Sequence, residues 1–253
     1  YYKYRQLFML LLPAIVLVFI FNYLPMYGIV LAFKKYRILD GIIGSPWVGL
    51  DNFKRMFSAT NDFGRVFINT IIISGLRIAF GFPAPIILAL LLNEVGNKHF
   101  KRITHTISYL PQFLSWVILA GIFQLFLSPS TGIINQAIKH LGFEPIYFFA
   151  NPKWFRPLLV GTYMWQSAGW GSIIYLAAIS NVDPQLYESA VIDGANRLKQ
   201  VLHITIPSIM PVIVIMFILR VGHIMNAGFD QVFNFYNPVV YSVADIIDTY
   251  VYR

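Results

Sequence analysis

Residues 183–211 read DPQLYESAVIDGANRLKQVLHITIPSIMP. Asp183 is a favourable residue before a helix, and Pro184 suits the first helical position. Gly194 can end that helix in a left-handed conformation. A second short helix is expected between this glycine and Pro207, where the following apolar stretch begins. The stretch therefore predicts two short helices joined by a tight turn.

Apolar residues form a stripe along this predicted helical pair. They are Val191, Ala195, Leu198 and Leu202. An amphipathic element outside a bilayer needs a surface that buries its apolar side. That surface is either the ends of this chain's own helices or a partner protein, and the pattern leaves both open.

The composition is that of a membrane protein. Of the 253 residues, 57% are hydrophobic and 12% are charged, whereas soluble domains average about 45–50% and about 25%. This excludes disorder, a coiled coil and a conventional soluble enzyme. A helix needs about 20 apolar residues to cross a bilayer. Five segments qualify as spans: 7–33, 66–93, 103–127, 157–182 and 200–229.

The remaining segments are connections. Residues 231–244 are apolar but too short to cross, and Pro238 interrupts them. Two long loops, 34–65 and 128–156, are expected on the outer side, and residues 50–57 have the spacing of a short surface helix. With the N-terminus inside, more basic residues fall outside than inside, so charge alone does not fix the orientation. The net charge of +8 is assigned to loops, not to nucleic acid binding.

The 183–211 stretch resembles the EAA loop of ATP-binding-cassette importer permeases. Its match consists of Glu188-Ser189-Ala190, Gly194, Ile204, Ile206 and Pro207, with both family spacings kept. Ser189 stands for alanine and Ile206 for leucine, which are mild departures. The segments 82–90, 108–117 and 228–231 resemble the oligosaccharide and polysaccharide permeases of the carbohydrate-uptake group, such as those for alginate, aldouronate or rhamnogalacturonan oligomers.

This resemblance implies an all-α fold, a polytopic transmembrane helical bundle. Five spans are visible and a sixth is expected, so we expect the sequence to be trimmed at its C-terminus. Residues 1–253 would form a single transmembrane permease domain with a cytoplasmic coupling loop at 183–207. By the same resemblance the chain lies in the bacterial cytoplasmic (inner) membrane.

The resemblance also implies partners. They are a second homologous permease chain, a dimer of ATP-binding subunits, an extracytoplasmic solute-binding protein, an oligosaccharide and the lipid bilayer, but no nucleic acid. The chain itself would be no enzyme and would hold no cofactor or metal; it has no G-x-x-x-x-G-K-[ST] motif, so ATP and Mg would belong to the ATPase. The implied coupling residues are Glu188, Ala190, Asp193, Gly194, Ile204 and Pro207.

The fourth predicted span suggests a sugar path. Tyr163, Gln166 and Trp170 share one helical face and offer hydroxyl, amide and aromatic groups that suit sugar rings. The alternative is that these side chains pack against lipid or other helices. Trp and Tyr are also enriched at bilayer interfaces.

Two arginines lie inside predicted spans, where a charge is costly and usually faces a polar cavity or a partner. Arg220, with His223 and Asn226 at helical spacing, is predicted to line the path and to meet a carboxylate if the sugar is acidic. Pairing at a permease interface is the alternative for Arg220. For Arg77 a structural pairing is favoured.

Other functions remain open at this point. A secondary transporter driven by an ion gradient is the main alternative, although acidic residues and inverted repeats are not evident within the spans. A membrane scaffold would not need the loop spacing described above. A membrane enzyme lacks a catalytic constellation.

Overall fold

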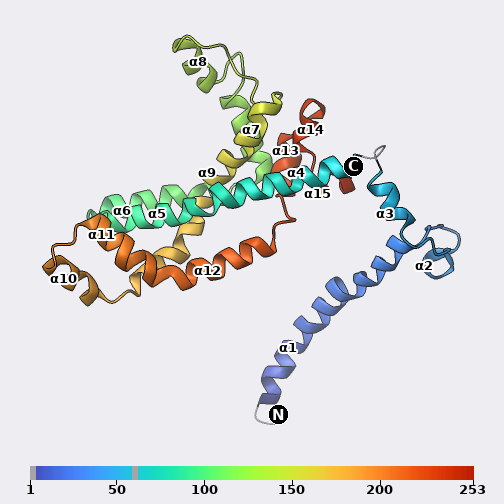
Figure 1. Cartoon of the computed structure of the whole chain (residues 1–253), viewed down its shortest axis with the longest axis horizontal. Helices are drawn as coiled ribbons and strands as arrows, with labels where there is room; N and C mark the ends of the chain where they lie inside the picture. Colours follow the sequence, from blue (N-terminus) through green and yellow to red (C-terminus); the bar gives the residue numbers. More distant parts are fainter. Residues whose placement is uncertain (1–3, 59–61) are drawn as a thin grey trace. The chain divides into compact units, whose positions relative to one another are not determined.

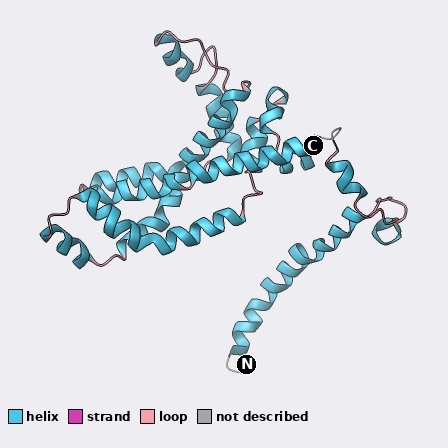
Figure 2. Ribbon diagram, viewed as in Figure 1, coloured by secondary structure: helices cyan, strands magenta, loops and turns pink. Residues whose placement is uncertain are grey.

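The computed structural model describes residues 4–58 and 62–253. In this part of the chain the regular structure is helical (Figure 2), apart from two isolated β-bridges that join Lys34 to Trp47 and Arg37 to Gly41. The predicted all-helical architecture is confirmed. By its internal contacts the chain divides into two units, Tyr1–Gly64 and Arg65–Arg253.

The first unit begins with one apolar helical run over Arg5–Phe33. It consists of α1 (Arg5–Val18), the π-helical turn η2 (Phe19–Tyr23) and the 3₁₀ helix η3 (Leu24–Phe33). The winding changes beside Pro25, which has no N–H to donate to an α-helical bond. The run matches the first predicted span.

The rest of this unit is a loop folded on the end of η3. It contains α2 (Gly41–Gly44) and α3 (Asp51–Met56). Lys34 is buried, and its Nζ donates to the carbonyls of Ile42 and Ile43 at 2.9 Å. Asn52 at the start of α3 donates to the carbonyls of Ala32 and Lys34. The predicted short helix is present.

Another apolar run, Phe63–Glu94, lies almost entirely in the second unit and is made of α4 (Phe63–Leu76), η4 (Arg77–Gly81) and α5 (Pro83–Glu94). The third predicted span is not one straight helix. Lys98–Phe113, which joins α6 (Lys98–Tyr109) to η5 (Leu110–Phe113), bends by 107° from α7 (Trp116–Phe126). Leu114 is extended, and the hydroxyl of Ser115 caps the new helix at Ile118. The loop beyond α7 holds α8 (Ile133–His140).

The central helix is α9 (Pro152–Ser180), which contacts α5, α6 and α12 (Ile206–Gly222) (Figure 1). Gly169 permits the close approach of α6, since a Cβ there would collide with the backbone of Ser108. At 29 residues α9 is long enough to cross a bilayer, but it is less apolar than the runs Arg5–Phe33, Phe63–Glu94 and Arg197–Gly222. Neighbouring helices bury its polar side chains, so the fourth predicted span does not need an apolar surface all round.

The chain ends in short helices. Before α12 lie α10 (Pro184–Ile192), α11 (Arg197–Gln200) and η6 (Val201–Thr205). After α12 lie α13 (Phe229–Phe235), η7 (Pro238–Val240), α14 (Tyr241–Ala244) and α15 (Ile247–Tyr252). Residues 231–244 thus lie in α13, η7 and α14, which are too short to cross a bilayer, as predicted. The side chains of Phe155, Leu159, Val232 and Phe235 form a core that fixes α13 against α9.

Candidate functional site

A cavity of about 370 Å³ lies where η4, α7, α9 and the end of α12 meet residues 226–231. We call it the cation cavity. Its lining comprises Arg77, Trp116, Tyr163, Arg220, His223, Asn226, Gly228, Phe229, Asp230 and Gln231. It brings together residues that lie far apart in the sequence.

Two guanidinium groups contact one aromatic ring in this cavity. The Cζ atoms of Arg77 and Arg220 lie 4.7 Å and 5.1 Å from the ring centroid of Tyr163. The negative face of an aromatic ring attracts a cation and partly offsets the cost of removing it from water. The tyrosine therefore holds two positive charges close together.

Arg77 is fixed by buried hydrogen bonds. Its Nη2 donates to Oε1 of Gln231, and the amide of Gln231 donates to the carbonyl of Leu159 at 2.8 Å and to Oγ1 of Thr162 at 2.7 Å. Gly228 has a φ of 82°, and a Cβ there would overlap the guanidinium of Arg77. The favoured structural pairing of Arg77 is confirmed, with an amide as its partner.

Arg220 differs from Arg77, because it is only half-buried and its guanidinium makes no hydrogen bond within the described residues. In residues 4–58 and 62–253, neither arginine forms an ion pair. Asp230 lines the same cavity without pairing with them. The cavity thus carries two cations and one carboxylate that pairs with neither of them, so its net charge is positive and it is suited to an anionic group.

A second cavity of about 210 Å³ shares Tyr163 and Arg220 with the first. Trp170 lines it and is half exposed, with its ring edge-on to Phe113 at 5.7 Å. The pair Tyr163–Arg220 therefore stands between an aromatic cavity and a polar one.

Five of the six predicted path residues line these cavities. The exception is Gln166, which is buried and donates to the carbonyl of Leu114 at 3.4 Å. The predicted helical spacing of His223 and Asn226 is wrong, because α12 ends at Gly222 and His223 is its C-cap. A turn after the helix brings both residues to the cavity.

Sequence reasoning gave no role to Trp116, Gly228, Asp230 and Gln231, which also line the cation cavity. Three of them lie in the 228–231 segment, noted above only for its family resemblance. The left-handed Gly228 and the amide of Gln231 act on Arg77, which is 154 residues away from Gln231. Such a pairing leaves no local signal.

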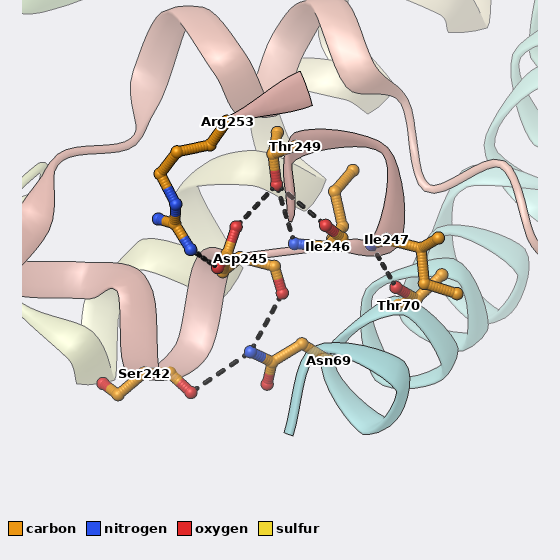
Figure 3. A network of polar contacts seen from close by, with 8 residues as sticks. All are labelled: Asn69, Thr70, Ser242, Asp245, Ile246, Ile247, Thr249 and Arg253. Carbon is orange, nitrogen blue, oxygen red and sulfur yellow. Dashed lines mark hydrogen bonds and ion pairs between the residues drawn. The ribbon is translucent and has the colours of Figure 1, made fainter. Parts of the chain in front are cut away.

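A polar network holds the segment that follows (Figure 3). Asp245 is fully buried, and its carboxylate accepts from Thr249 and Arg253 at 2.8 Å. Asn69 of α4 donates to the backbone carbonyls of Ser242 and Asp245. The network fixes α14 and the start of α15 to α4, and α15 in turn packs against α13, which begins within the 228–231 segment.

Burial also affects the hydroxyl groups of this region. It raises the pKa of Tyr236, and the neighbouring Tyr241 and Asp245 act in the same direction. Tyr236 therefore stays neutral at neutral pH.

In the part of the chain that the structure describes, no three acidic, histidine or cysteine side chains are arranged to hold a metal ion.

Residues 183–207, which we call the hairpin segment, fold largely as predicted. Asp183 caps α10 by accepting from the backbone N–H of Gln185 at 2.9 Å. Gly194 has a φ of 74°, and the N–H of Ala195 donates to the carbonyl of Ala190 at 2.8 Å. These features form a Schellman motif that closes the helix and turns the chain.

The second predicted helix is not a separate element. α11 continues through the π-helical turn η6 into α12, as one helical run over Arg197–Gly222. Pro207 lies near the start of α12 without breaking the run, because the wider turn before it changes the hydrogen-bond pattern. Pro207 therefore lies inside the helix that it was predicted to begin.

The predicted coupling residues lie along the hairpin segment, on α10, the turn after it, η6 and the start of α12. Glu188 and Asp193 are exposed, whereas Ala190 and Ile204 are half-buried. Glu188 lines a cavity of about 330 Å³ between the end of α5 and the hairpin segment. Three residues of the apolar stripe, Val191, Leu198 and Leu202, are exposed by half or more in this chain.

Long apolar helices together with a cavity lined by cations are features of a membrane transport protein. The chain belongs to the family of binding-protein-dependent transport system inner membrane components, whose family model matches residues 81–252. It is 46% identical to the polygalacturonan/rhamnogalacturonan transport system permease protein YteP of Bacillus subtilis (strain 168), over 98% of this chain and 77% of that protein. Protein LplB of the same organism is also 46% identical, over 98% of this chain and 78% of LplB.

The fold agrees with this membership. The chain matches the crystal structure of a bacterial ABC transporter involved in the import of the acidic polysaccharide alginate, with a TM-score of 0.90 and 43% identity, over 99% of this chain and 84% of that one. A similar match exists to a bacterial alginate ABC transporter in complex with an alginate pentasaccharide-bound periplasmic protein. The expected fold of an ABC importer permease is confirmed, and the ion-gradient alternative is not supported.

Proposed function

We propose that this chain is the membrane-spanning permease subunit of an ATP-driven importer for acidic oligosaccharides or polysaccharide fragments. YteP is named for the transport of polygalacturonan and rhamnogalacturonan, and the matching ABC transporter is involved in the import of alginate. The observation that carries the acidic preference is the cation cavity, in which Tyr163 holds two arginines without a described carboxylate partner.

The two arginines have different roles in this proposal. Arg77 is committed to Gln231 and fixes the walls, whereas the guanidinium of Arg220 is available to a ligand. A guanidinium matches a carboxylate with two parallel hydrogen bonds. The side chains of Trp170 and Asn226 supply an aromatic face and an amide for the sugar ring and its hydroxyls. Each repeating unit of an acidic sugar chain would present a carboxylate to Arg220.

Energy for transport would come from a partner. The exposed stripe of the hairpin segment would be buried in a dimer of ATP-binding subunits that holds ATP and Mg. Glu188 and Asp193 would pair there with basic groups, and Gly194 would keep the turn tight. Closure of the ATPase dimer would then rock this chain and a second homologous permease between inward-facing and outward-facing states.

The remaining partners follow from this arrangement. We place the chain as a single permease domain in the bacterial inner membrane, with residues 183–207 in the cytoplasm. A solute-binding protein would deliver the sugar to the outer loops at 34–65 and 128–156. The ATPase activity would belong to the partner subunits.

The test is cargo-stimulated ATP hydrolysis by the complex in proteoliposomes, with galacturonate oligomers and neutral oligosaccharides of equal length. A hydrogen bond to a charged group is worth about 1.5–3 kcal/mol. Arg220→Gln should therefore raise the concentration of acidic oligomer that gives half-maximal stimulation about ten- to a hundredfold. Arg102→Gln, at an exposed arginine of α6, should leave it unchanged.

Two outcomes would contradict the proposal. Equal stimulation by neutral and acidic oligomers would remove the acidic preference. A purified complex without any associated ATPase, with uptake driven by an ion gradient, would remove the ATP-driven mechanism.

A further inference from the structure

A side-chain hydrogen bond joins α10 to the helical run that continues into α12. The hydroxyl of Tyr187 in α10 lies 2.9 Å from Oγ1 of Thr205 in η6. Thr205 is 1% exposed and Tyr187 is half-buried, so water competes little for this bond. A bond of this kind holds α10 to the start of α12 independently of the backbone turn.

We infer that Tyr187 and Thr205 form a positioning brace that transmits movement of α10 to α12. The inference rests on the proposed coupling function and adds two residues that its motif does not contain. The brace acts through other residues, since neither side chain reaches the cation cavity at the far end of α12.

The brace is attached where the helix is easiest to bend. Val201–Thr205 is a π-helical turn, in which the N–H of Ile206 donates to the carbonyl of Val201. Pro207 follows and has no N–H for the carbonyls of this turn. Sharp bends in helices occur at such turns and at prolines. A pull on Thr205 would therefore tilt α12 about this turn.

Two other side-chain contacts of the hairpin segment are of different kinds. Nε2 of Gln200 donates to the carbonyl of Ala195 at 2.9 Å, which fixes the turn but does not reach α10. Arg197 pairs with Glu94 of α5 at 3.5 Å, but the arginine side chain is 83% exposed. An exposed pair contributes about 0–1 kcal/mol. The buried brace is the better transmitter of force.

The experiment uses the whole complex in proteoliposomes and measures sugar transported per ATP hydrolysed. This ratio does not depend on how much complex assembles. Tyr187→Phe and Thr205→Val each remove one hydroxyl, and Thr205→Ser keeps it. Tyr27→Phe removes the same atom from an exposed tyrosine and is the matched control.

We expect Tyr187→Phe and Thr205→Val each to lower the ratio about three- to tenfold, the effect of losing about 0.5–1.5 kcal/mol. The double variant should be no worse than either single one, because the bond can be lost only once. Thr205→Ser and Tyr27→Phe should keep the ratio of the unaltered protein. Full coupling in either single variant, or additive losses in the double, would overturn the brace. An unaltered complex that hydrolyses no ATP in response to sugar would instead overturn the proposed function.

Discussion

The cation cavity and the hairpin segment lie at opposite ends of the run Arg197–Gly222, and they are built differently. The cavity draws on residues between Arg77 and Gln231, and its two arginines are buried or half-buried. The hairpin segment is 25 residues of continuous sequence (183–207), and its charged groups are exposed. One region is held by long-range packing and the other by local turn chemistry.

This difference predicts how each region responds to substitution. Where side chains meet in a buried space, a single added atom must displace a neighbour. Where the surroundings are open, the same atom lowers the free energy of unfolding only through the local change in backbone conformation or charge. The predictions below compare matched substitutions in the two kinds of environment.

The largest effect is expected for Gly228→Ala. The residue has a φ of 82°, which costs a non-glycine residue about 1–2 kcal/mol, and the added Cβ would overlap the guanidinium of Arg77. Overpacking of this kind costs about 1–3 kcal/mol more. We expect a loss of about 2–5 kcal/mol in the free energy of unfolding, measured by denaturation of the purified protein.

Gly142→Ala is the matched control, because Gly142 has a φ of 84° and open space where the Cβ would lie. It should lose about 1–2 kcal/mol from the backbone alone. If both variants lose the same amount, the contact between Gly228 and Arg77 does not constrain the cavity.

A smaller effect is expected for Asp245→Asn in the network of Figure 3. The substitution keeps an acceptor for Thr249 but removes the charge that pairs with Arg253 at 2.8 Å. Asp245 is fully buried, so the free energy of unfolding should fall by about 1.5–3 kcal/mol. The same denaturation measurement applies.

Asp51→Asn serves as its control, because Asp51 and Lys54 form an exposed pair at 3.8 Å. That variant should change stability by about 0–1 kcal/mol. Equal losses in the two variants would mean that burial of Asp245 adds nothing to its pairing.

The same contrast explains what the sequence predicts. The hairpin segment is readable because its cap, Asp183, and its turn, Gly194, act on residues within a few positions. The apolar runs are readable because hydropathy is local as well. The bend between α6 and α7 is harder to predict from the sequence, because it depends on one extended residue, Leu114.

The cavity resists prediction for a physical reason. Arg220 was found because a charge in a span is costly wherever it lies. Gln231 was missed because its partner is 154 residues away. Gln166 shares a helical face with Tyr163, but its amide is buried and donates to the carbonyl of Leu114 instead of lining a cavity. α12 ends at Gly222 and His223 is its C-cap, but Gly222 is not in the left-handed conformation that marks many helix ends.

The smallest effect is expected for Arg197→Gln in the hairpin segment. The pair with Glu94 is 3.5 Å long, and the arginine is 83% exposed, so water and salt screen it. We expect a change in unfolding free energy of about 0–1 kcal/mol, which disappears at high salt. Lys199→Gln, which removes a nearby exposed charge of α11, is the control. The amount of sugar transported per ATP should stay within about twofold of the unaltered protein in both variants. A twofold change corresponds to less than about 0.5 kcal/mol. A loss in Arg197→Gln as large as that in Tyr187→Phe would mean that an exposed ion pair, and not the buried brace, joins the hairpin segment to the membrane helices.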